Sequence, residues 1–225
     1  MRYRTAAVVA AFLTMLFIPL VVPGDCAAAS SGLGLKAGWA FAKQDYNYSS
    51  TDLHFDNSYR TGFGAGVFVE QPLIPLIALR AEGMYIQKGF KSNVLQTDLN
   101  GQPIPQTSDL LYRVDYISTD ILGKASLPTG TYVMAGPRLD FKVHTNQNAA
   151  ILPVELEDRF ASTLFGWTFG VGQSFAMSPS AALFVEGQLY IDQSKLYDRA
   201  DGGITTAPLE SVRNKSFAVY AGIRF

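Results

Sequence analysis

The sequence predicts an all-β chain, folded as an eight-stranded antiparallel transmembrane up-and-down β-barrel with four long extracellular loops and three short periplasmic turns. Three observations predict this fold. Eight runs of residues alternate between apolar and polar side chains with a period of two. Long polar connections alternate strictly with short ones, as in outer-membrane barrels. The chain also ends inside a strand-like run, residues 214–225, and pairing of that run with the first strand removes the open edge.

The first 29 residues have the pattern of a secretory signal peptide. Two arginines precede an apolar run that reaches about residue 18, and three small residues follow at 27–29. Pro19 interrupts the run, which is shorter than the roughly 20 residues of a transmembrane helix. We therefore expect cleavage after Ala29, loss of the single cysteine, Cys26, and a barrel domain at residues 30–225.

The eight expected strands lie at 34–43, 59–70, 77–88, 116–126, 132–143, 163–175, 182–192 and 214–225. In each of them the odd positions are mainly apolar. Strand by strand they are Leu35, Ala37, Trp39 and Phe41; Phe63, Ala65, Val67 and Val69; Ile77, Leu79, Ala81 and Tyr85; Ile117, Ile121 and Ala125; Val133, Ala135, Leu139, Phe141 and Val143; Phe165, Trp167, Phe169, Val171 and Phe175; Leu183, Val185, Leu189 and Ile191; and Phe217, Val219, Ala221, Ile223 and Phe225.

The even positions carry glycines and charges. The charged ones are Lys36, Arg60, Glu70, Arg80, Glu82, Lys88, Asp120, Lys124, Arg138, Asp140, Lys142, Glu186, Asp192 and Arg224. These eight cations and six anions nearly balance, which favours an internal ion-pair network. Facing lipid, each would cost up to roughly 2–4 kcal/mol near the bilayer midplane. The odd positions are therefore expected to face lipid, and the even ones the barrel interior.

The lengths of the connections indicate which end of the barrel is extracellular and which is periplasmic. Long polar connections lie at about 44–58, 90–113, 145–162 and 193–214, whereas the short ones, at 71–75, 127–130 and 176–180, each contain proline. The second long connection contains Asn100-Gly101, which predicts a hairpin tip beyond the membrane. Both termini are then periplasmic.

Six segments resemble a known family. "GLKAGWAFAK", "GFGAGVFVEQPL", "LRAEGMYIQKGFKS", "DYISTDILGKA", "YVMAGPRLDF" and "AVYAGIRF" resemble the PorT-like outer membrane protein β-barrel domain family and, more loosely, the small OmpX and OmpA-type barrels. The resemblance covers residues 32–225. It implies export to the outer membrane of a Gram-negative-type bacterium and an assembly signal at Phe225, Ile223 and Tyr220, read by the barrel assembly machinery. The family it resembles has no uniform biochemical activity, so the resemblance predicts fold and location rather than function.

No catalytic, cofactor or metal site is expected. The two histidines are His54 and His144. Asp140 shares the inward parity of His144, but four strand residues span about 13 Å, beyond hydrogen-bonding reach. A catalytic dyad with a residue of another strand remains an alternative. An enzyme acting on lipid A or peptides is therefore a less favoured function for the barrel. The near-neutral charge, −1 for the whole chain, argues against nucleic acid as a partner.

The favoured function is a non-enzymatic scaffold with a plugged interior. An eight-stranded barrel is about wide enough for its own side chains. Its expected partners are outer-membrane lipid, the assembly machinery and an unknown extracellular ligand at the loops. The tyrosines Tyr46, Tyr48, Tyr59, Tyr112 and Tyr197 either contact such a ligand or form the upper aromatic girdle. The alternative is a narrow porin-like channel for small solutes.

Overall fold

The computed structural model describes residues 31–48, 57–97, 103–147, 161–194, 197–198 and 209–225. The expected signal peptide, with Cys26, and the histidine His54 lie outside these residues. Among the described residues, no helix is long and apolar enough to cross a membrane.

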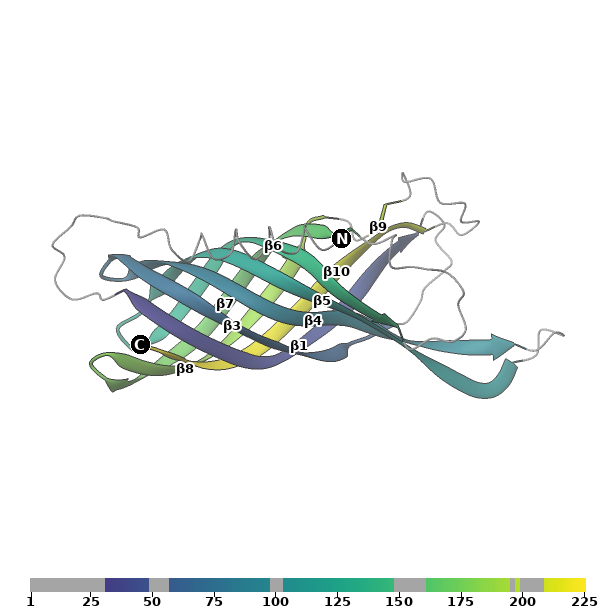
Figure 1. Ribbon diagram of the computed structural model, residues 1–225, viewed down its shortest axis with the longest axis horizontal. Helices are drawn as coiled ribbons and strands as arrows, with labels where there is room; N and C mark the ends of the chain where they lie inside the picture. The colour runs from purple at the N-terminus through teal and green to yellow at the C-terminus, as the bar shows by residue number, and fades with distance from the viewer. Residues whose placement is uncertain (1–30, 49–56, 98–102, 148–160, 195–196, 199–208) are drawn as a thin grey trace.

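Eight long strands form a closed, tilted wall (Figure 1). They are β1 (Gly32–Tyr48), β3 (Arg60–Ile74), β4 (Ile77–Thr97), β5 (Pro103–Ser126), β6 (Thr131–Gln147), β7 (Thr163–Ser178), β8 (Ala181–Asp192) and β10 (Leu209–Arg224). Two-residue strands, β2 (Asn57–Ser58) and β9 (Tyr197–Asp198), pair with β4 and β10. Each long strand pairs antiparallel with its neighbours, and β1 pairs with β10. The expected eight-stranded antiparallel barrel is confirmed.

The seam between β1 and β10 includes the last residue of the chain. The amide of Phe225 donates a hydrogen bond to the carbonyl of Leu33 at 2.8 Å, and the amide of Leu33 donates to the carbonyl of Phe225 at 3.2 Å. The ladder continues from Gly34 opposite Arg224 to Tyr48 opposite Leu209. Closure therefore leaves no free edge at this seam within the membrane-spanning part.

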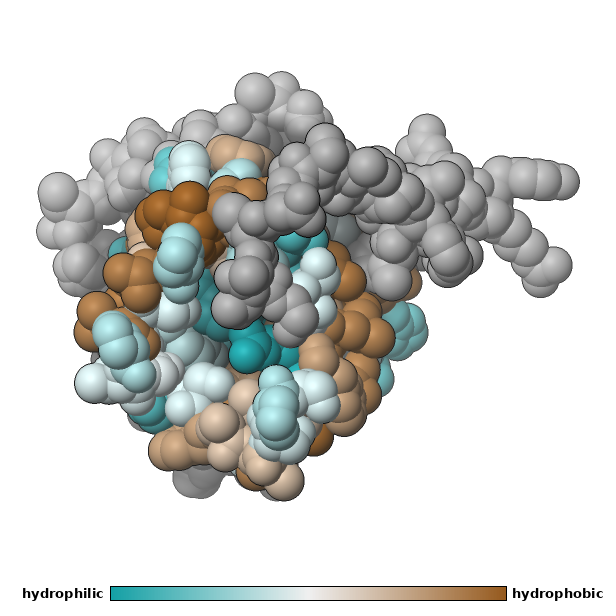
Figure 2. Space-filling view, turned by 90° about the vertical axis from the view of Figure 1, so that its left-hand side faces the viewer, coloured by the Kyte–Doolittle hydropathy of each residue, from teal (hydrophilic) through white to brown (hydrophobic). Residues whose placement is uncertain are grey.

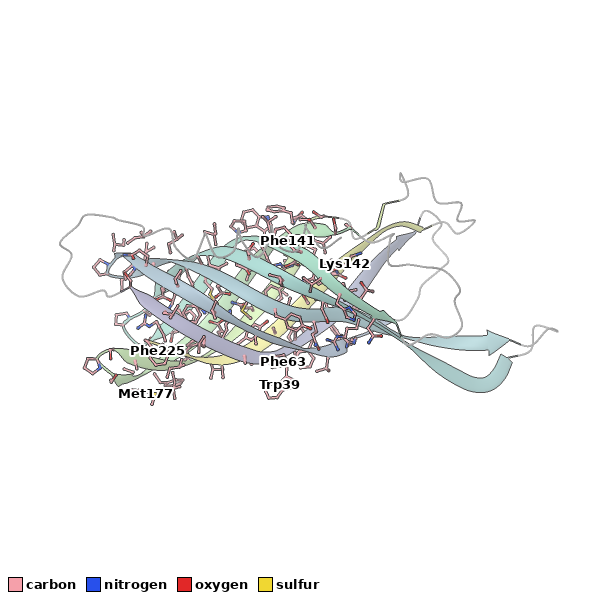
Figure 3. All side chains as sticks on the ribbon, in the orientation of Figure 1. Trp39, Phe63, Phe141, Lys142, Met177 and Phe225 are labelled. Carbon is pink, nitrogen blue, oxygen red and sulfur yellow. The ribbon has the colours of Figure 1, made fainter. Side chains whose placement is uncertain are left out.

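The side chains alternate across the wall as the period of two predicts. In β8, Leu183 and Val185 are 45% and 48% exposed, whereas Phe184 between them is 4% exposed. Trp39 and Met177 point away from the wall (Figure 3). Viewed from the end with the short turns, hydrophilic residues occupy the middle of the barrel and hydrophobic residues its periphery (Figure 2). The outward band is the surface that lipid covers.

The two ends of the barrel differ. Short turns join β3 to β4, β5 to β6 and β7 to β8, and Gly130, with φ of +84°, provides the left-handed conformation in one of them. At the other end β4 and β5 stay paired as far as Thr97 opposite Pro103. They form a two-stranded ribbon that projects to the right in Figure 1. Most of the long connection expected at 90–113 is therefore strand, and its tip lies outside the described residues.

Candidate functional site

The lumen holds most of the fourteen charged residues on the even positions. Eleven are buried: Lys36, Glu70, Arg80, Glu82, Lys88, Asp120, Lys124, Arg138, Asp140, Glu186 and Asp192. The other three lie nearer the ends of the barrel, where Arg60 and Lys142 are half-buried and the Arg224 side chain is 40% exposed. The ion pairs of these fourteen residues lie at three levels along the barrel axis.

The periplasmic level centres on Glu70 of β3. Its carboxylate oxygens lie 2.8 Å from Nζ of Lys124 and 2.9 Å from Nη1 of Arg224. Lys124 also lies over the ring of Tyr132, 4.2 Å from its centroid. One carboxylate thus connects β3, β5 and the last strand at this end of the barrel.

The central level is a closed cycle of four charges from three strands. Nζ of Lys36 lies 2.6 Å from Glu82 and 2.7 Å from Glu186. Arg80 reaches the same two carboxylates, at 2.7 Å and 3.0 Å. The hydroxyl of Tyr132 donates a hydrogen bond of 2.8 Å to Glu186. Each charge therefore has two opposite charges beside it, which offsets the cost of its removal from water.

Aromatic rings and glycines complete this level. The guanidinium of Arg80 lies 3.6 Å from the ring centroid of Phe68 and 5.4 Å from that of Phe184. A Cβ atom placed at Gly34 would fall on the Phe68 ring, and one at Gly222 would fall on the Phe184 ring. The two glycines therefore provide the space for the two rings. At this level the Arg80 guanidinium and the two rings therefore pack together inside the barrel.

The upper level joins β4, β6 and β8. Lys88 lies 2.5 Å from Asp140 and 3.7 Å from Asp192. Arg138 forms ion pairs with the same two carboxylates. Its distance to Asp140 is 3.1 Å, and it also contacts Asp192 directly. Ser118 donates a hydrogen bond of 2.5 Å to Asp140. This is a second cycle of two cations and two anions.

Asp120 lies between the two cycles and differs from the other buried carboxylates. It faces Glu82 on one neighbouring strand and Arg138 on the other. The hydroxyl of Thr168 donates a hydrogen bond of 2.5 Å to it. Among the described residues no cation lies within ion-pair distance of its carboxylate. Asp120 is therefore held by a neutral donor beside a second carboxylate.

Neutral side chains occupy the lumen around the upper cycle. Ile86, Val114 and Leu164 are buried there with inward tyrosines. The hydroxyl of Tyr190 donates to that of Tyr220 at 2.9 Å. The prediction for the lumen was limited to the charges, and Tyr220 was assigned to the assembly signal. The even positions of Ile86, Val114, Leu164 and both tyrosines nevertheless place them on the inward face. The lumen thus has an apolar segment as well as an ionic one.

His144 does not share a face with Asp140, and that expectation is wrong. A bulge at Val143 shifts the register, so His144 lies opposite Asp115, on the outward face at the extracellular end. The Asp115 carboxylate accepts two hydrogen bonds of 2.7 Å from Arg113 and one of 2.8 Å from Tyr85. The pairing of β5 with β6 therefore brings Asp115 opposite His144, but the hydrogen bonds to the Asp115 carboxylate come from other residues.

The outward side chains of β5 from Ile117 to Ala125 carry no charge, and Asp115 lies beyond them, towards the extracellular end. Burial alone would raise the pKa of its carboxyl. The hydrogen bonds from Arg113 and Tyr85 outweigh that effect and hold the pKa below its ordinary value of 3.8. Within the described residues no group of three potential ligands could hold a metal ion.

The remaining predicted residues lie at the seam and the extracellular end. Phe225 is 57% exposed, Ile223 is half-buried, and Tyr220 is buried in the lumen. Tyr59 is 56% exposed and lies edge-on to Phe217, with 5.8 Å between ring centroids. This contact places Tyr59 in an aromatic cluster on the outer wall. The side chains of Tyr46, Tyr48, Tyr112 and Tyr197 lie outside the described residues.

These features define a membrane-spanning β-barrel with an ion-paired lumen. The family model of the outer membrane protein beta-barrel domain matches residues 27–191, and the chain belongs to that family. Membership places the barrel in an outer membrane. Among curated proteins, none matches the sequence.

Several solved barrels are similar in structure at low sequence identity. OprG of Pseudomonas aeruginosa matches with 10% identity, a TM-score of 0.49, and coverage of 87% of this chain and 96% of OprG. Neisserial surface protein A matches with 15% identity, a TM-score of 0.45, and coverage of 87% and 98%. Ail, the attachment invasion locus protein of Yersinia pestis, matches with 11% identity, a TM-score of 0.40, and coverage of 88% and 100%.

Proposed function

We propose that the protein is a non-enzymatic scaffold of the outer membrane, a filled barrel that displays its extracellular segments. The observation that carries the proposal is the closed cycle of Lys36, Glu82, Arg80 and Glu186, with the Arg80 guanidinium between two aromatic rings. A channel at this level would have to leave some of these charges unpaired. Breaking a buried pair costs about 3–5 kcal/mol. The cycle therefore favours a plug over the alternative of a narrow porin-like channel.

The contacts of Asp115 support the non-enzymatic part of the proposal. A histidine can use a carboxylate partner only when that carboxylate orients the imidazole through a hydrogen bond. Here Arg113 and Tyr85 take three of the about four acceptor positions of the carboxylate of Asp115, the residue opposite His144. The proposal therefore assigns Asp115 a structural role at the extracellular end.

The ribbon formed by β4 and β5 supports the display part of the proposal. Beyond Tyr112 opposite Gln147, β5 has no register partner on β6 among the described residues, while its pairing with β4 continues. A segment that projects from a rigid wall is suited to contact a partner without disturbing the wall.

The route to the membrane is a part of the same proposal. Residues 1–29 would direct export in a Gram-negative-type cell and be removed. The closing strand, with Phe225 in the ladder of the seam, would then be read by the barrel assembly machinery. Within the family, the motifs quoted above support a PorT-like branch.

Shortening the ribbon tests the display model. Replacement of residues 93–109 by Asn-Gly joins the register partners Ser92 and Leu110 and should leave the barrel folded, because the ion-paired levels lie outside that segment. The measurement is the heat-dependent shift in gel mobility, with the urea midpoint of unfolding in lipid vesicles. An unchanged midpoint supports a displayed ribbon. A large loss of stability would show that the ribbon is a structural part of the barrel, and the display model would fail.

A further inference from the structure

The middle of the lumen holds one more buried carboxylate than its ion pairs use. The central cycle and the upper cycle each contain two cations and two anions, so each cycle is neutral. Asp120 lies between the two cycles and is 2% exposed. An ionised carboxylate is very unfavourable when it is buried without a cation. Asp120 therefore needs a means of neutralisation other than an ion pair.

The cation opposite Asp120 does not neutralise it. Arg138 is the register partner of Asp120 on β6. Its guanidinium forms ion pairs with Asp140 and Asp192 instead, and among the described residues its Nη1 atom has no hydrogen-bond partner. An ionised Asp120 would attract this donor strongly, because charge-assisted hydrogen bonds are roughly twice as strong as neutral ones. The position of the guanidinium therefore indicates a neutral Asp120.

The strand on the other side of Asp120 offers a hydrogen-bond acceptor. Glu82 is the register partner of Asp120 on β4, and both side chains are buried in the lumen. Such cross-strand partners have their Cβ atoms about 5 Å apart, within reach of each other. Oε2 of Glu82 accepts hydrogen bonds from Lys36 and Gln188. Oε1 lies 2.7 Å from Nε of Arg80, but within the described part of the chain it accepts no hydrogen bond.

We propose that Asp120 is a proton-binding site, at which the carboxyl group carries a proton on Oδ2 and donates a hydrogen bond to Oε1 of Glu82. The hydroxyl of Thr168 donates to Oδ1 at 2.5 Å, which makes Oδ1 the carbonyl oxygen. A protonated carboxyl group has both a donor and an acceptor, so it satisfies both neighbours. The two cycles and the carboxyl group between them are then without net charge.

The groups around the site favour the neutral carboxyl. The other charged or titratable groups that face Asp120 are Arg138 and Asp140 on β6, Tyr190 on β8 and Tyr220 on β10. The single cation of this set already pairs with two other carboxylates. Loss of the proton would place a second negative charge directly opposite Glu82, and like charges in such a pair are unfavourable. Release of the proton should therefore weaken the pairing of β4 with β5 at this level.

Infrared spectroscopy of the refolded barrel in lipid vesicles at neutral pH tests the site. A protonated carboxyl group gives a C=O stretching band that an ionised carboxylate lacks. The wild-type protein should show this band, and Asp120→Asn should abolish it. Thr168→Val should keep the band and move it to higher frequency, because Oδ1 loses its hydrogen bond. Asp115→Asn is the matched control and should leave the band unchanged, since Arg113 holds Asp115 as a carboxylate.

The pH dependence of unfolding provides a second readout. Asp120 is protonated in the folded barrel and ionised in the unfolded chain at neutral pH, so folding takes up a proton at this site. The urea midpoint of Asp120→Asn should therefore rise relative to that of wild type as the pH is raised from acid to neutral. The proposal is overturned if the folded wild-type barrel lacks the band, if Asp120→Asn retains it, or if the two midpoints follow pH identically. Heat-dependent gel mobility confirms that each variant is folded.

Discussion

Strands β1 and β4 line the same lumen with side chains of opposite size. The inward residues of β1 include Gly34, Gly38, Ala40 and Ala42, with Lys36 as the one long side chain among them. Those of β4 are nearly all long, from Arg80 to Lys88. The large residues of one part of the wall therefore occupy space that small residues leave in another. Large and small inward residues complement each other in size, and the ion pairs determine which side chain occupies which space.

The largest effect is expected at Arg80 on the β4 side. Arg80→Ala removes one member of the central cycle and leaves Glu82 and Glu186 with Lys36 alone. Loss of one partner from a buried network should lower the free energy of unfolding by about 3–5 kcal/mol. Urea titration in lipid vesicles, followed by the fluorescence of the outward Trp39 and Trp167, measures it. A loss below about 1 kcal/mol, as for a surface pair, would contradict the central role of the cycle.

A similar effect is expected at a second buried carboxylate. Asp140→Asn should cost about 3–5 kcal/mol, because Lys88 and Arg138 both pair with Asp140. Asp120→Asn is the matched variant. It should be neutral or stabilising, since Asp120 has no described cationic partner and faces Glu82. Equal losses in the same urea titration would show that the two carboxylates are held in the same way, contrary to the structure.

On the β1 side the expected effect is steric. Gly34→Leu would drive a side chain into the Phe68 ring and should lower stability by about 1–3 kcal/mol. Gly187→Leu is the control, because Gly187 is on the outward face and no heavy atom lies within 4 Å of a Cβ placed there. The difference between the two urea midpoints measures how tightly the rings fill the lumen. Tolerance of leucine at position 34 would indicate spare space beside β1.

The smallest effect is expected at the extracellular end. The folded-state pKa of Asp115 is depressed, so its hydrogen bonds stabilise the fold above the ordinary pKa of 3.8 and this contribution is lost as pH falls through the folded value. Asp115→Asn should therefore cost about 0.2–1 kcal/mol at neutral pH, and the difference from wild type should shrink as the pH falls below 4. Urea midpoints at pH 7 and pH 3 measure it. If the difference in urea midpoint between wild type and Asp115→Asn grew on acidification, the pKa of Asp115 would not be depressed in the folded state.

The period of two was sufficient to predict the closed barrel and to assign residues to the two faces. It could not give the ion pairs, because Lys36, Glu82 and Glu186 come from three strands whose relative stagger depends on register. It also misassigned His144, since a bulge at Val143 changes the parity without a clear local signal. The ribbon was predicted as a hairpin from Asn100-Gly101, but its pairing extends through residues whose alternation is weak.

Single-channel conductance of the refolded barrel in a planar bilayer tests the central claim most directly. The wild-type protein, shown to be folded by its heat-dependent gel mobility, should give no discrete current steps, because Arg80, Phe68 and Phe184 fill the central level. A triple variant, Arg80→Ser with Phe68→Ala and Phe184→Ala, should open a path and produce steps if it still folds. Reproducible steps from the folded wild-type barrel would contradict the filled lumen and favour the channel.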